Sequence, residues 1–374
     1  MSCKFIITIT IFIFITSCTP SQQFLEQRGE VISDKSSFIR VLLHKSDAPV
    51  VVGSVKRIKV KNLKSGKLLV DGKSKKIKFF SDKLSSPVEI ESWDAPLIVN
   101  GKPYRGKIEL HNVTGKIYVI NVVSMEHYIM GVVSAEMSPN WHIEAVKAQA
   151  VAARTYAFHT LLNKKSASIY DLDSTTKFQV YKGMEGETTN SNLAVSQTAG
   201  QILSYNNKPI LALFHSTCGG RIINNKYVWD GEDLPYLSDK VVPYGKSSPH
   251  YKWKTELTLY EIKKVLDSRY NNIGAVTGLS FKKHQGRVVE VIITHKNGRA
   301  NVSGNDFRMM IPGGKVKSQF FNAFRTKNGL RLEGRGWGHG VGMCQYSAKE
   351  MAEEGKTYKT ILSFFYKDVQ FTKF

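Results

Sequence analysis

Glu136 is the carboxylate whose neighbours best suit it to act as an acid. It stands between Ala135 and Met137, and Trp141 follows a few residues later. A carboxyl group in apolar surroundings keeps its proton to a higher pH than one in water, and a protonated carboxyl can serve as a general acid. The same segment precedes a predicted helix, whose N-terminus favours the ionised form. From these residues alone, a general acid and a helix-capping carboxylate are equally good interpretations of Glu136.

Arg154 stands out on the long helix that the spacing of apolar residues predicts. This helix is expected between Pro139, which suits an opening turn, and Lys164. Its apolar positions are Ile143, Val146, Ala150, Ala153, Ala157 and Leu161. At about 100° per residue, Arg154 projects about 20° from Ile143 and so lies on the apolar face. A buried guanidinium needs a carboxylate or several carbonyl oxygens, so Arg154 is either a structural tie or the floor of a polar site.

Two pairs of His and Cys residues offer metal, nucleophile or disulfide chemistry. His215 lies three residues before Cys218, and His339 and Cys344 form a second pair near the C-terminus. Imidazole and thiolate are common zinc ligands, and a Cys beside a His can act as a nucleophile. In an exported chain whose Cys18 carries lipid, Cys218 and Cys344 are the remaining thiols, so a disulfide between them is at least as good an interpretation.

Glycine occupies every second position from Gly334 to Gly342, around His339. This spacing differs from the G-x-G-x-x-G pattern of dinucleotide sites. Glycine lets the backbone approach a ligand closely, and we expect His339 to lie at the mouth of the following helix, where the N-terminus favours an anion. The alternative is a tight turn around a packed His339.

The N-terminal elements that support these residues are predicted to be β-strands. From Phe38 to about Val123, short β-rich runs alternate with turn signals. Asp71-Gly72 and Asn100-Gly101 each lie between apolar runs and are predicted hairpin turns.

The rest of the chain has a mixed pattern. A hairpin turn is predicted at Asn206-Asn207 and a helix at about 259–270. The C-terminal block predicts a strand, the glycine-rich loop and a helix that ends at Gly355. The expected fold class is therefore α+β, with a β-rich N-terminal lobe followed by a mixed α/β domain that has a long helix after Glu136.

The first 18 residues predict the compartment. Lys4 is followed by an apolar run of about eleven residues, which is short of the roughly 20 needed to span a bilayer, so a cleaved secretory signal is expected. The end of this segment, ITSC, is similar to a bacterial lipobox and predicts lipid on Cys18; ordinary cleavage near Ser17 is the alternative. Residues 19–37 are polar and aperiodic, as is typical of a tether.

Composition limits the class of partner. The 374 residues include 53 Lys and Arg against 31 Asp and Glu, for a formal charge of +22, which indicates an acidic partner. An exported chain does not meet nucleic acid as its ordinary partner. An anionic membrane or an acidic wall glycan is therefore expected instead.

Five blocks of the chain, in the same order, resemble the stage II sporulation protein D family, which includes the amidase enhancers. The resemblance spans about residues 110–370 and is weaker before 110. The blocks are VVSMEHYIMGVVSAEMSPNWHIEAVKAQAVAARTYAFH (122–159), TTKFQVYKG (175–183), FHSTCGG (214–220), YVWDGEDLPYL (227–237) and GRGWGHGVGMCQYSAKEMAEEGKTYKTILSFFY (334–366).

The resemblance implies a peptidoglycan lytic transglycosylase, which cuts the MurNAc–GlcNAc bond of strands stripped of peptides and leaves a 1,6-anhydro-MurNAc end. It implies that the catalytic acid/base is Glu136 of SAEM and that the important helix arginine is Arg154 of AVAARTY, which would orient Glu136 or bind the lactyl carboxylate. One carboxylate suffices because the C6 hydroxyl of the substrate attacks, whereas a hydrolase needs a second one. The further substrate contacts that it implies are His215, Tyr251, Lys252 and His339.

Some members of the family bind zinc through Cys and His near the segment that corresponds to TTKFQVY, but residues 165–185 contain neither. We therefore predict no zinc there and no cofactor. The main alternative function is a non-catalytic, glycan-binding enhancer of an N-acetylmuramoyl-L-alanine amidase, and a purely structural glycan-binding lipoprotein is a third. The expected partners are peptidoglycan glycan strands, a membrane through the lipid anchor and a cell-wall amidase.

The expected domains follow from these patterns. They are a signal peptide (1–18), a polar tether (19–37), a β-rich accessory region (38–108) and the catalytic region (109–374).

Overall fold

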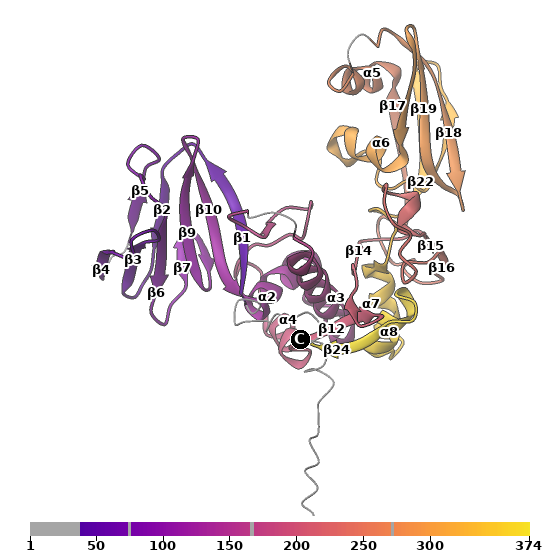
Figure 1. Ribbon diagram of the computed structural model, residues 1–374. Helices are drawn as coiled ribbons and strands as arrows, with labels where there is room; N and C mark the ends of the chain where they lie inside the picture. Colours follow the sequence, from indigo (N-terminus) through magenta and orange to yellow (C-terminus); the bar gives the residue numbers. More distant parts are fainter. Residues whose placement is uncertain (1–37, 74–75, 165–167, 271–272) are drawn as a thin grey trace, which may run out of the picture.

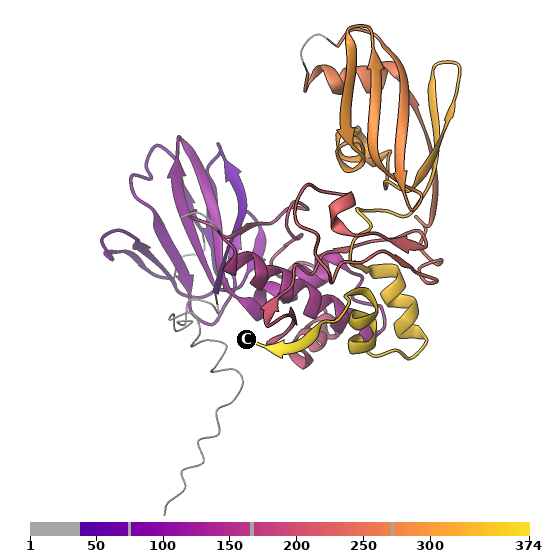
Figure 2. The ribbon, with the colours of Figure 1, turned by 45° about the vertical axis from the view of Figure 1, so that its right-hand side comes forward.

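The computed structural model describes residues 38–374 except 74–75, 165–167 and 271–272. The predicted signal peptide, the lipid site at Cys18 and the tether at 19–37 lie outside the described residues. The described chain has three parts: an N-terminal β lobe, a central group of helices, and a subdomain of strands and helices on the far side of that centre (Figures 1 and 2). The predicted α+β class is confirmed.

The N-terminal lobe is built from two sheets. The strands are β1 (Phe38–Ser46), β2 (Val50–Gly53), β3 (Ile58–Asn62), β4 (Leu68–Gly72), β5 (Ile77–Phe79), β6 (Val88–Ser92), β7 (Leu97–Val99), β8 (Lys102–Tyr104), β9 (Lys107–Val113), β10 (Lys116–Ser124) and β11 (Leu172–Asp173). One sheet has the order β11-β1-β10-β9-β6-β3-β4 and the other β5-β2-β7-β8. Alternate residues along β9 are buried, as expected for strands with one face on a core.

Two of the three predicted hairpin turns are confirmed. Asn100 and Gly101 connect β7 to β8 with φ of 46° and 89°, and Asn206 and Asn207 turn the chain with φ of 48° and 59°. The turn predicted at Asp71-Gly72 is wrong, because both residues lie inside β4 and pair with β3. Arg57 also forms an ion pair with Asp71, and the next strand along the chain, β5, belongs to the other sheet.

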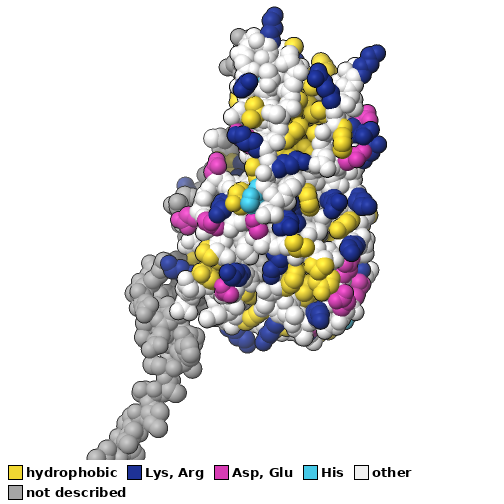
Figure 3. All heavy atoms as spheres, turned by 90° about the vertical axis from the view of Figure 1, so that its right-hand side faces the viewer, with side chains coloured by type: hydrophobic (Ala, Val, Ile, Leu, Met, Phe, Trp, Pro, Cys, Tyr) yellow, Lys and Arg dark blue, Asp and Glu magenta, His cyan; other side chains and the backbone are white. Residues whose placement is uncertain are grey.

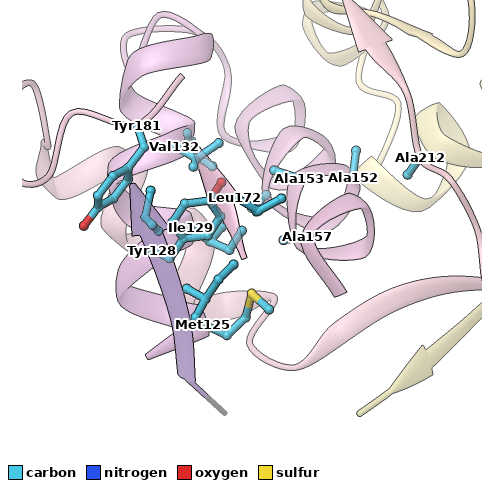
Figure 4. Close-up of a cluster of buried hydrophobic side chains, with 14 of the residues drawn as sticks. Met125, Tyr128, Ile129, Val132, Ala152, Ala153, Ala157, Leu172, Tyr181 and Ala212 are labelled. Carbon is cyan, nitrogen blue, oxygen red and sulfur yellow. The ribbon is translucent and has the colours of Figure 1, made fainter. Parts of the chain in front are cut away.

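The centre of the molecule consists of helices around α3. They are α2 (Met125–Glu136), α3 (Ile143–Leu162), α4 (Thr189–Gln197), α7 (Gln345–Glu353) and α8 (Tyr358–Phe365). Helix α3 packs against all four others, and its alanines allow close approach. Figure 4 shows side chains of α2, among them Met125 and Ile129, directed towards Ala153 and Ala157 of α3.

The long helix begins later than the sequence predicts. It starts at Ile143, where the ring of His142 accepts a hydrogen bond from the Glu144 N–H. Pro139 lies in the preceding turn, in which the Trp141 N–H bonds to the Ser138 carbonyl. Helix α2, which the sequence pattern does not predict, ends at Glu136.

Short strands join the centre to the C-terminal block. They are β12 (Gln201–Tyr205), β13 (Lys208–Pro209), β14 (Phe214–His215), β15 (Arg221–Ile222), β16 (Lys240–Val241), β23 (Met343–Cys344) and β24 (Gln370–Lys373), with the 3-10 turn η2 (Asn225–Tyr227). A second 3-10 turn, η3 (Pro312–Gly314), belongs to the subdomain on the far side of the centre. Strand β14 pairs in parallel with β23. The predicted order of strand, glycine-rich loop and helix in the C-terminal block is confirmed, with Gly355 at φ 82° just after α7.

The far subdomain, here called the inserted subdomain, consists of residues 252–335. Its elements are β17 (Lys252–Thr258), α5 (Leu259–Asp267), β18 (Val276–His284), β19 (Arg287–His295), β20 (Gly298–Ser303), α6 (Gly304–Met310), β21 (Phe321–Arg325) and β22 (Gly329–Arg335). It forms two three-stranded sheets, β17-β22-β21 and β18-β19-β20, and has its own buried core around Phe307.

The β lobe and the helical centre, by contrast, share one buried core. The domain boundary expected at 108/109 falls inside β9, whose neighbours β6 and β10 belong to the same sheet. The sheet therefore runs across that boundary without interruption.

Candidate functional site

Glu136 is the last residue of α2 and is only partly exposed. One carboxylate oxygen, Oε1, accepts a hydrogen bond of 2.6 Å from the Val180 N–H. Desolvation raises the pKa of Glu136 above its ordinary value, and the Val180 hydrogen bond partly opposes this. The sequence predicts Glu136 before a helix N-terminus, whereas the structure places it at a helix C-terminus. The dipole there disfavours a negative charge, so it acts in the same direction as burial.

The loop that carries Val180 is anchored by buried hydrogen bonds. Gln179 donates to the Ala153 carbonyl at 3.2 Å and accepts from the Tyr128 hydroxyl at 3.2 Å. The Tyr181 hydroxyl donates to Asn121 at 2.7 Å. These bonds on either side of Val180 fix the amide that faces Glu136.

The C-terminal block reaches Glu136 from the opposite end of the sequence. Gln345, the first residue of α7, donates from Nε2 to the Glu136 carbonyl at 3.0 Å and to Gln149 Oε1 at 3.2 Å. The rings of Trp141 and Tyr346 lie 4.8 Å apart, edge to face. The segment around Glu136 is therefore held by the residues that follow the glycine-rich loop.

Val180 and Gln345 contact Glu136, and Gln149 contacts Gln345; the sequence predicts none of these three neighbours. Gln149 had a signal, because it is a polar side chain within the run AVKAQAVAAR of a buried helix. The Val180 contact is made by a backbone N–H, which every residue except proline has, so the residue type at this position could not predict it.

Arg154 is fully buried, and its guanidinium is bonded to Glu126 rather than to Glu136. Its Nε and Nη2 donate to the two carboxylate oxygens of Glu126 at 2.8 and 2.7 Å, and Nη1 donates to the Gln201 carbonyl at 3.1 Å. The orienting contact with Glu136 expected for Arg154 is therefore not present, and a lactyl carboxylate would have to displace Glu126. The geometry matches the structural tie, which joins α3 to the first turn of α2.

The glycine-rich loop packs against the chain rather than opening towards a ligand. A Cβ on Gly342 would lie 2.0 Å from the Leu213 carbonyl oxygen, and one on Gly340 would lie 2.4 Å from Cζ of the buried Arg287. His339 donates from Nε2 to the Phe214 carbonyl at 2.9 Å and accepts at Nδ1 from the Val341 N–H at 3.1 Å. Both ring nitrogens are thus used internally, which favours the packed turn over the anion site expected at His339.

His215 lies beside this loop on β14. Its Nδ1 donates to the Val341 carbonyl at 3.1 Å, and its ring centroid is 5.2 Å from that of His339. Burial lowers the pKa of both rings, so both are neutral near pH 7. The structure thus brings the buried His215 beside the partly buried His339, with the two rings in contact.

Cys218 and Cys344 are neighbours and are both buried, free thiols in this structure. The Cys218 N–H donates to Cys344 Sγ at 3.2 Å, and the Ser347 hydroxyl donates to the same sulfur at 3.0 Å. Hydrogen bonds from Cys344 and His215 hold the pKa of the Cys218 thiol well below its ordinary value. The disulfide stays a prediction, which this proximity favours. Within the described ranges, no three His, Cys, Asp or Glu side chains are grouped so that they could hold a metal ion.

Tyr251 and Lys252 lie where the chain enters the inserted subdomain. The Tyr251 carbonyl accepts a hydrogen bond of 3.2 Å from the Gly336 N–H, at the start of the glycine-rich loop, and Lys252 is exposed on β17. Two partly exposed tryptophans flank the same loop: Trp337 lies against His250 at 4.1 Å between ring centroids, and Trp229 is 5.1 Å from His339. Exposed aromatic rings of this kind can stack on sugar rings.

None of the helices in the part of the chain that the structure describes combines the length and the apolar character needed to cross a membrane.

Comparison with known proteins gives two family matches. Residues 113–205 match the model of a family described as Stage II sporulation protein, which includes the segment from Glu136 to Val180. Residues 242–342, which contain the inserted subdomain, match a domain of unknown function (DUF8618).

Several curated proteins are similar over most of the chain. An uncharacterised protein of Brachyspira hyodysenteriae is 34% identical over 279 residues, which is 72% of this chain and 73% of that protein. Stage II sporulation protein D of Bacillus subtilis is 34% identical over 265 residues, 67% of this chain and 75% of that protein. An amidase enhancer of Bacillus subtilis is 29% identical over 364 residues, 84% of this chain and 50% of that protein.

Proposed function

The chain belongs to the stage II sporulation protein D family, and on that premise we propose that it is an exported peptidoglycan lytic transglycosylase whose acid is Glu136. Membership of this family supports a role at the cell wall. The observation that supports lytic transglycosylase activity in particular is the environment of Glu136. It is a partly exposed carboxyl group whose pKa is raised by desolvation. Such a group still holds its proton at a pH where an ordinary carboxyl has lost it, as a general acid must.

In the first step, protonated Glu136 gives its proton to the glycosidic oxygen between MurNAc and GlcNAc. The bond from that oxygen to C1 of MurNAc breaks with both electrons going to the oxygen, and positive charge develops on the sugar ring. The Val180 N–H stabilises the carboxylate that Glu136 becomes.

In the second step, the C6 hydroxyl of the same MurNAc attacks C1. The Glu136 carboxylate takes the hydroxyl proton, so the group returns to its starting state and the product is the 1,6-anhydro sugar. No water and no second carboxylate take part in this step, and the Val180 N–H is the partner of the Glu136 carboxylate among the described residues.

The test is product analysis on glycan strands without stem peptides. We expect the wild-type protein to release fragments with anhydro ends, and the Glu136→Gln variant to release at least a thousandfold less, because an amide cannot transfer the proton. The matched control is Glu354→Gln, which changes an exposed carboxylate beyond the end of α7. Mass spectrometry detects the anhydro ends by the loss of one water, and wild-type product levels from Glu136→Gln would exclude Glu136 from the chemistry.

The similarity to an amidase enhancer over 84% of this chain favours one alternative. In that case the protein binds glycan and stimulates an N-acetylmuramoyl-L-alanine amidase without cleaving glycan itself. The same variant separates the two functions: the enhancer predicts full amidase stimulation by Glu136→Gln and no anhydro ends from the wild-type protein alone. In either case the proposed location is the cell envelope, with the lipid on Cys18 as the anchor.

A further inference from the structure

An open cavity of about 450 Å³ lies on the inserted subdomain, on the sheet β17-β22-β21. Its lining includes three cations, Lys252, Lys254 and Arg335, together with Phe320, Asn322 and Glu333. The strands place Lys252, Lys254, Glu333 and Arg335 on the exposed face of this sheet, whereas Trp253 points into the core.

The cations of this cavity exceed the carboxylates that could neutralise them. Lys252 and Arg335 stand directly opposite each other on β17 and β22, an arrangement of like charges that destabilises an antiparallel pair. Among the described residues, no carboxylate lies within ion-pair distance of either side chain. The repulsion between the Lys252 and Arg335 side chains is reduced when an anion binds between them.

Glu333 does not supply the missing negative charge. Its Oε1 is 3.1 Å from Arg331 Nε and 3.9 Å from Lys254 Nζ, so two cations already share it. Lys283 adds a further cation at the edge, where its Nζ donates to Asn322 at 2.7 Å. Figure 3 shows one face of the molecule, with Lys and Arg side chains spread over the subdomain at the top and over the region below it.

The Arg335 side chain lies above an aromatic ring. Its guanidinium carbon is 5.9 Å from the centre of the Phe320 ring, which limits its freedom in the cavity. A guanidinium held in this way can present two N–H groups to one carboxylate, which is the geometry that arginine uses for bidentate binding.

The cavity is continuous in sequence with the glycine-rich loop. Arg335 ends β22, and the next residues are Gly336 and the partly exposed Trp337, over which Lys317 lies at 4.5 Å. A ligand that extends from the cavity along this edge meets a tryptophan ring beside a lysine. That combination suits a sugar polymer that carries negative charges at intervals.

We propose that this cavity is a binding site for carboxylate groups of an acidic glycan strand, and that the inserted subdomain thereby selects strands with free lactyl carboxylates. The inference rests on the proposed function for its choice of glycan. Lys252 and Arg335 bind one carboxylate between them, Lys254 supports it from the neighbouring exposed position on β17, and Trp337 stacks on a neighbouring sugar.

The test measures binding to two oligosaccharides of equal length in the Glu136→Gln background of the full chain, where no cleavage takes place. One is a denuded GlcNAc–MurNAc strand, and the other is a chitin oligosaccharide, which has no carboxylates. We expect the double variant Lys252→Gln/Arg335→Gln to bind the acidic strand at least tenfold more weakly at low salt and to bind chitin oligosaccharide unchanged.

The matched control is Lys264→Gln/Arg299→Gln, which removes the same charge from exposed positions of the same subdomain. Thermal melting of both double variants shows whether they are folded. The single variant Arg335→Lys is milder, because it keeps the charge and loses only the bidentate geometry. An equal loss for both oligosaccharides, or the same loss in the control, would overturn the inference. Tighter binding of a polyphosphate of equal charge than of the acidic strand would overturn the choice of glycan.

The outcome is independent of catalysis. If wild-type protein releases no anhydro ends but the Lys252/Arg335 variant still loses the acidic strand selectively, the proposed enzyme activity fails and the site stands. If anhydro ends are released and the variant binds both oligosaccharides like wild type, the enzyme stands and the site fails.

Discussion

At the scale of single residues, Glu136 and Arg154 show that the groups bonded to a charged side chain determine whether it is structural or available for chemistry. Both are polar residues on helices that pack against each other, and both belong to motifs typical of the family. Arg154 has its charge neutralised by Glu126 and is bonded to main-chain carbonyls, so it joins two helices. Glu136 accepts a hydrogen bond from an amide and has no ion pair with a described residue, so burial raises its pKa.

The raised pKa of Glu136 predicts how its replacement changes stability with pH. A carboxyl whose pKa is higher in the folded than in the unfolded state contributes stability below the unfolded value, and this contribution is lost as pH rises through the folded value. Gln keeps the neutral state at every pH. We therefore expect Glu136→Gln to be more stable than wild type at pH 8 and to lose this advantage at pH 4.

Urea unfolding at the two pH values measures the difference. Glu354→Gln serves as the control again, because its side chain is exposed, and it should show no such change. A Glu136→Gln advantage that grows as pH falls would contradict the raised pKa.

At the scale of elements, the glycine-rich loop is the joint between distant segments. It connects β22 of the inserted subdomain to β23, and its backbone packs tightly against the segment that contains β14. Through Gln345 at the start of α7 it also holds the main chain of Glu136. The loop thus supports the candidate active site through its backbone, and its glycines are required by neighbouring main chain.

A pair of Gly→Ala variants tests this role. Gly342 has φ of 67°, and a Cβ there would meet the Leu213 carbonyl at 2.0 Å, whereas a Cβ on Gly355, where φ is 82°, would meet no atom within 4 Å. Gly355→Ala should cost about 1 kcal/mol for the left-handed backbone alone. Gly342→Ala should cost about 3 kcal/mol or more, because the methyl group also displaces β14.

Chemical denaturation of both variants gives the comparison. Equal losses for Gly342→Ala and Gly355→Ala would mean that the loop tolerates a side chain and that its packing against β14 is loose.

At the scale of the whole molecule, the chain has two hydrophobic cores and one long insertion. The β lobe and the helices share the first core, and the inserted subdomain has the second. The insertion, residues 252–335, lies between Cys218 and Cys344, which are 126 positions apart in the chain and adjacent in the fold. A bond between their thiols would close a loop that contains the inserted subdomain.

We predict that the protein isolated from an oxidising compartment carries this disulfide. Its formation joins the two sulfurs and passes two electrons to an external disulfide or thiol oxidase. Closing a loop of this length restricts the unfolded chain and should add about 5 kcal/mol to the free energy of unfolding. Intact mass after maleimide labelling, with and without reductant, counts the free thiols.

The matched control is Cys218→Ser/Cys344→Ser, which cannot form the bond and should unfold at the same urea concentration with or without reductant. Two labelled thiols in freshly isolated, unreduced wild-type protein would contradict the prediction.

Features that depend on neighbours along the chain could be predicted from the amino-acid sequence. The α+β class, the hairpins at Asn100-Gly101 and Asn206-Asn207, and the C-terminal helix all follow from periodicity and turn chemistry over a few residues. The five motif blocks, which include the one around Glu136, were sufficient to recognise the family. The turn predicted at Asp71-Gly72 is wrong because both residues pair with β3, and this pairing depends on the sheet rather than on the two residues themselves.

The packing of whole elements, by contrast, determines which groups meet. Arg154 bonds to Glu126, Val180 to Glu136, and Lys252 faces Arg335, each pair being separated by 28 or more positions. Periodicity indicates whether a side chain is buried or exposed, but its partner depends on how helices and sheets dock against one another. Burial in the folded chain raises the pKa of Glu136, and strand pairing gathers the excess charge of the cavity, so neither property could be predicted from the sequence alone.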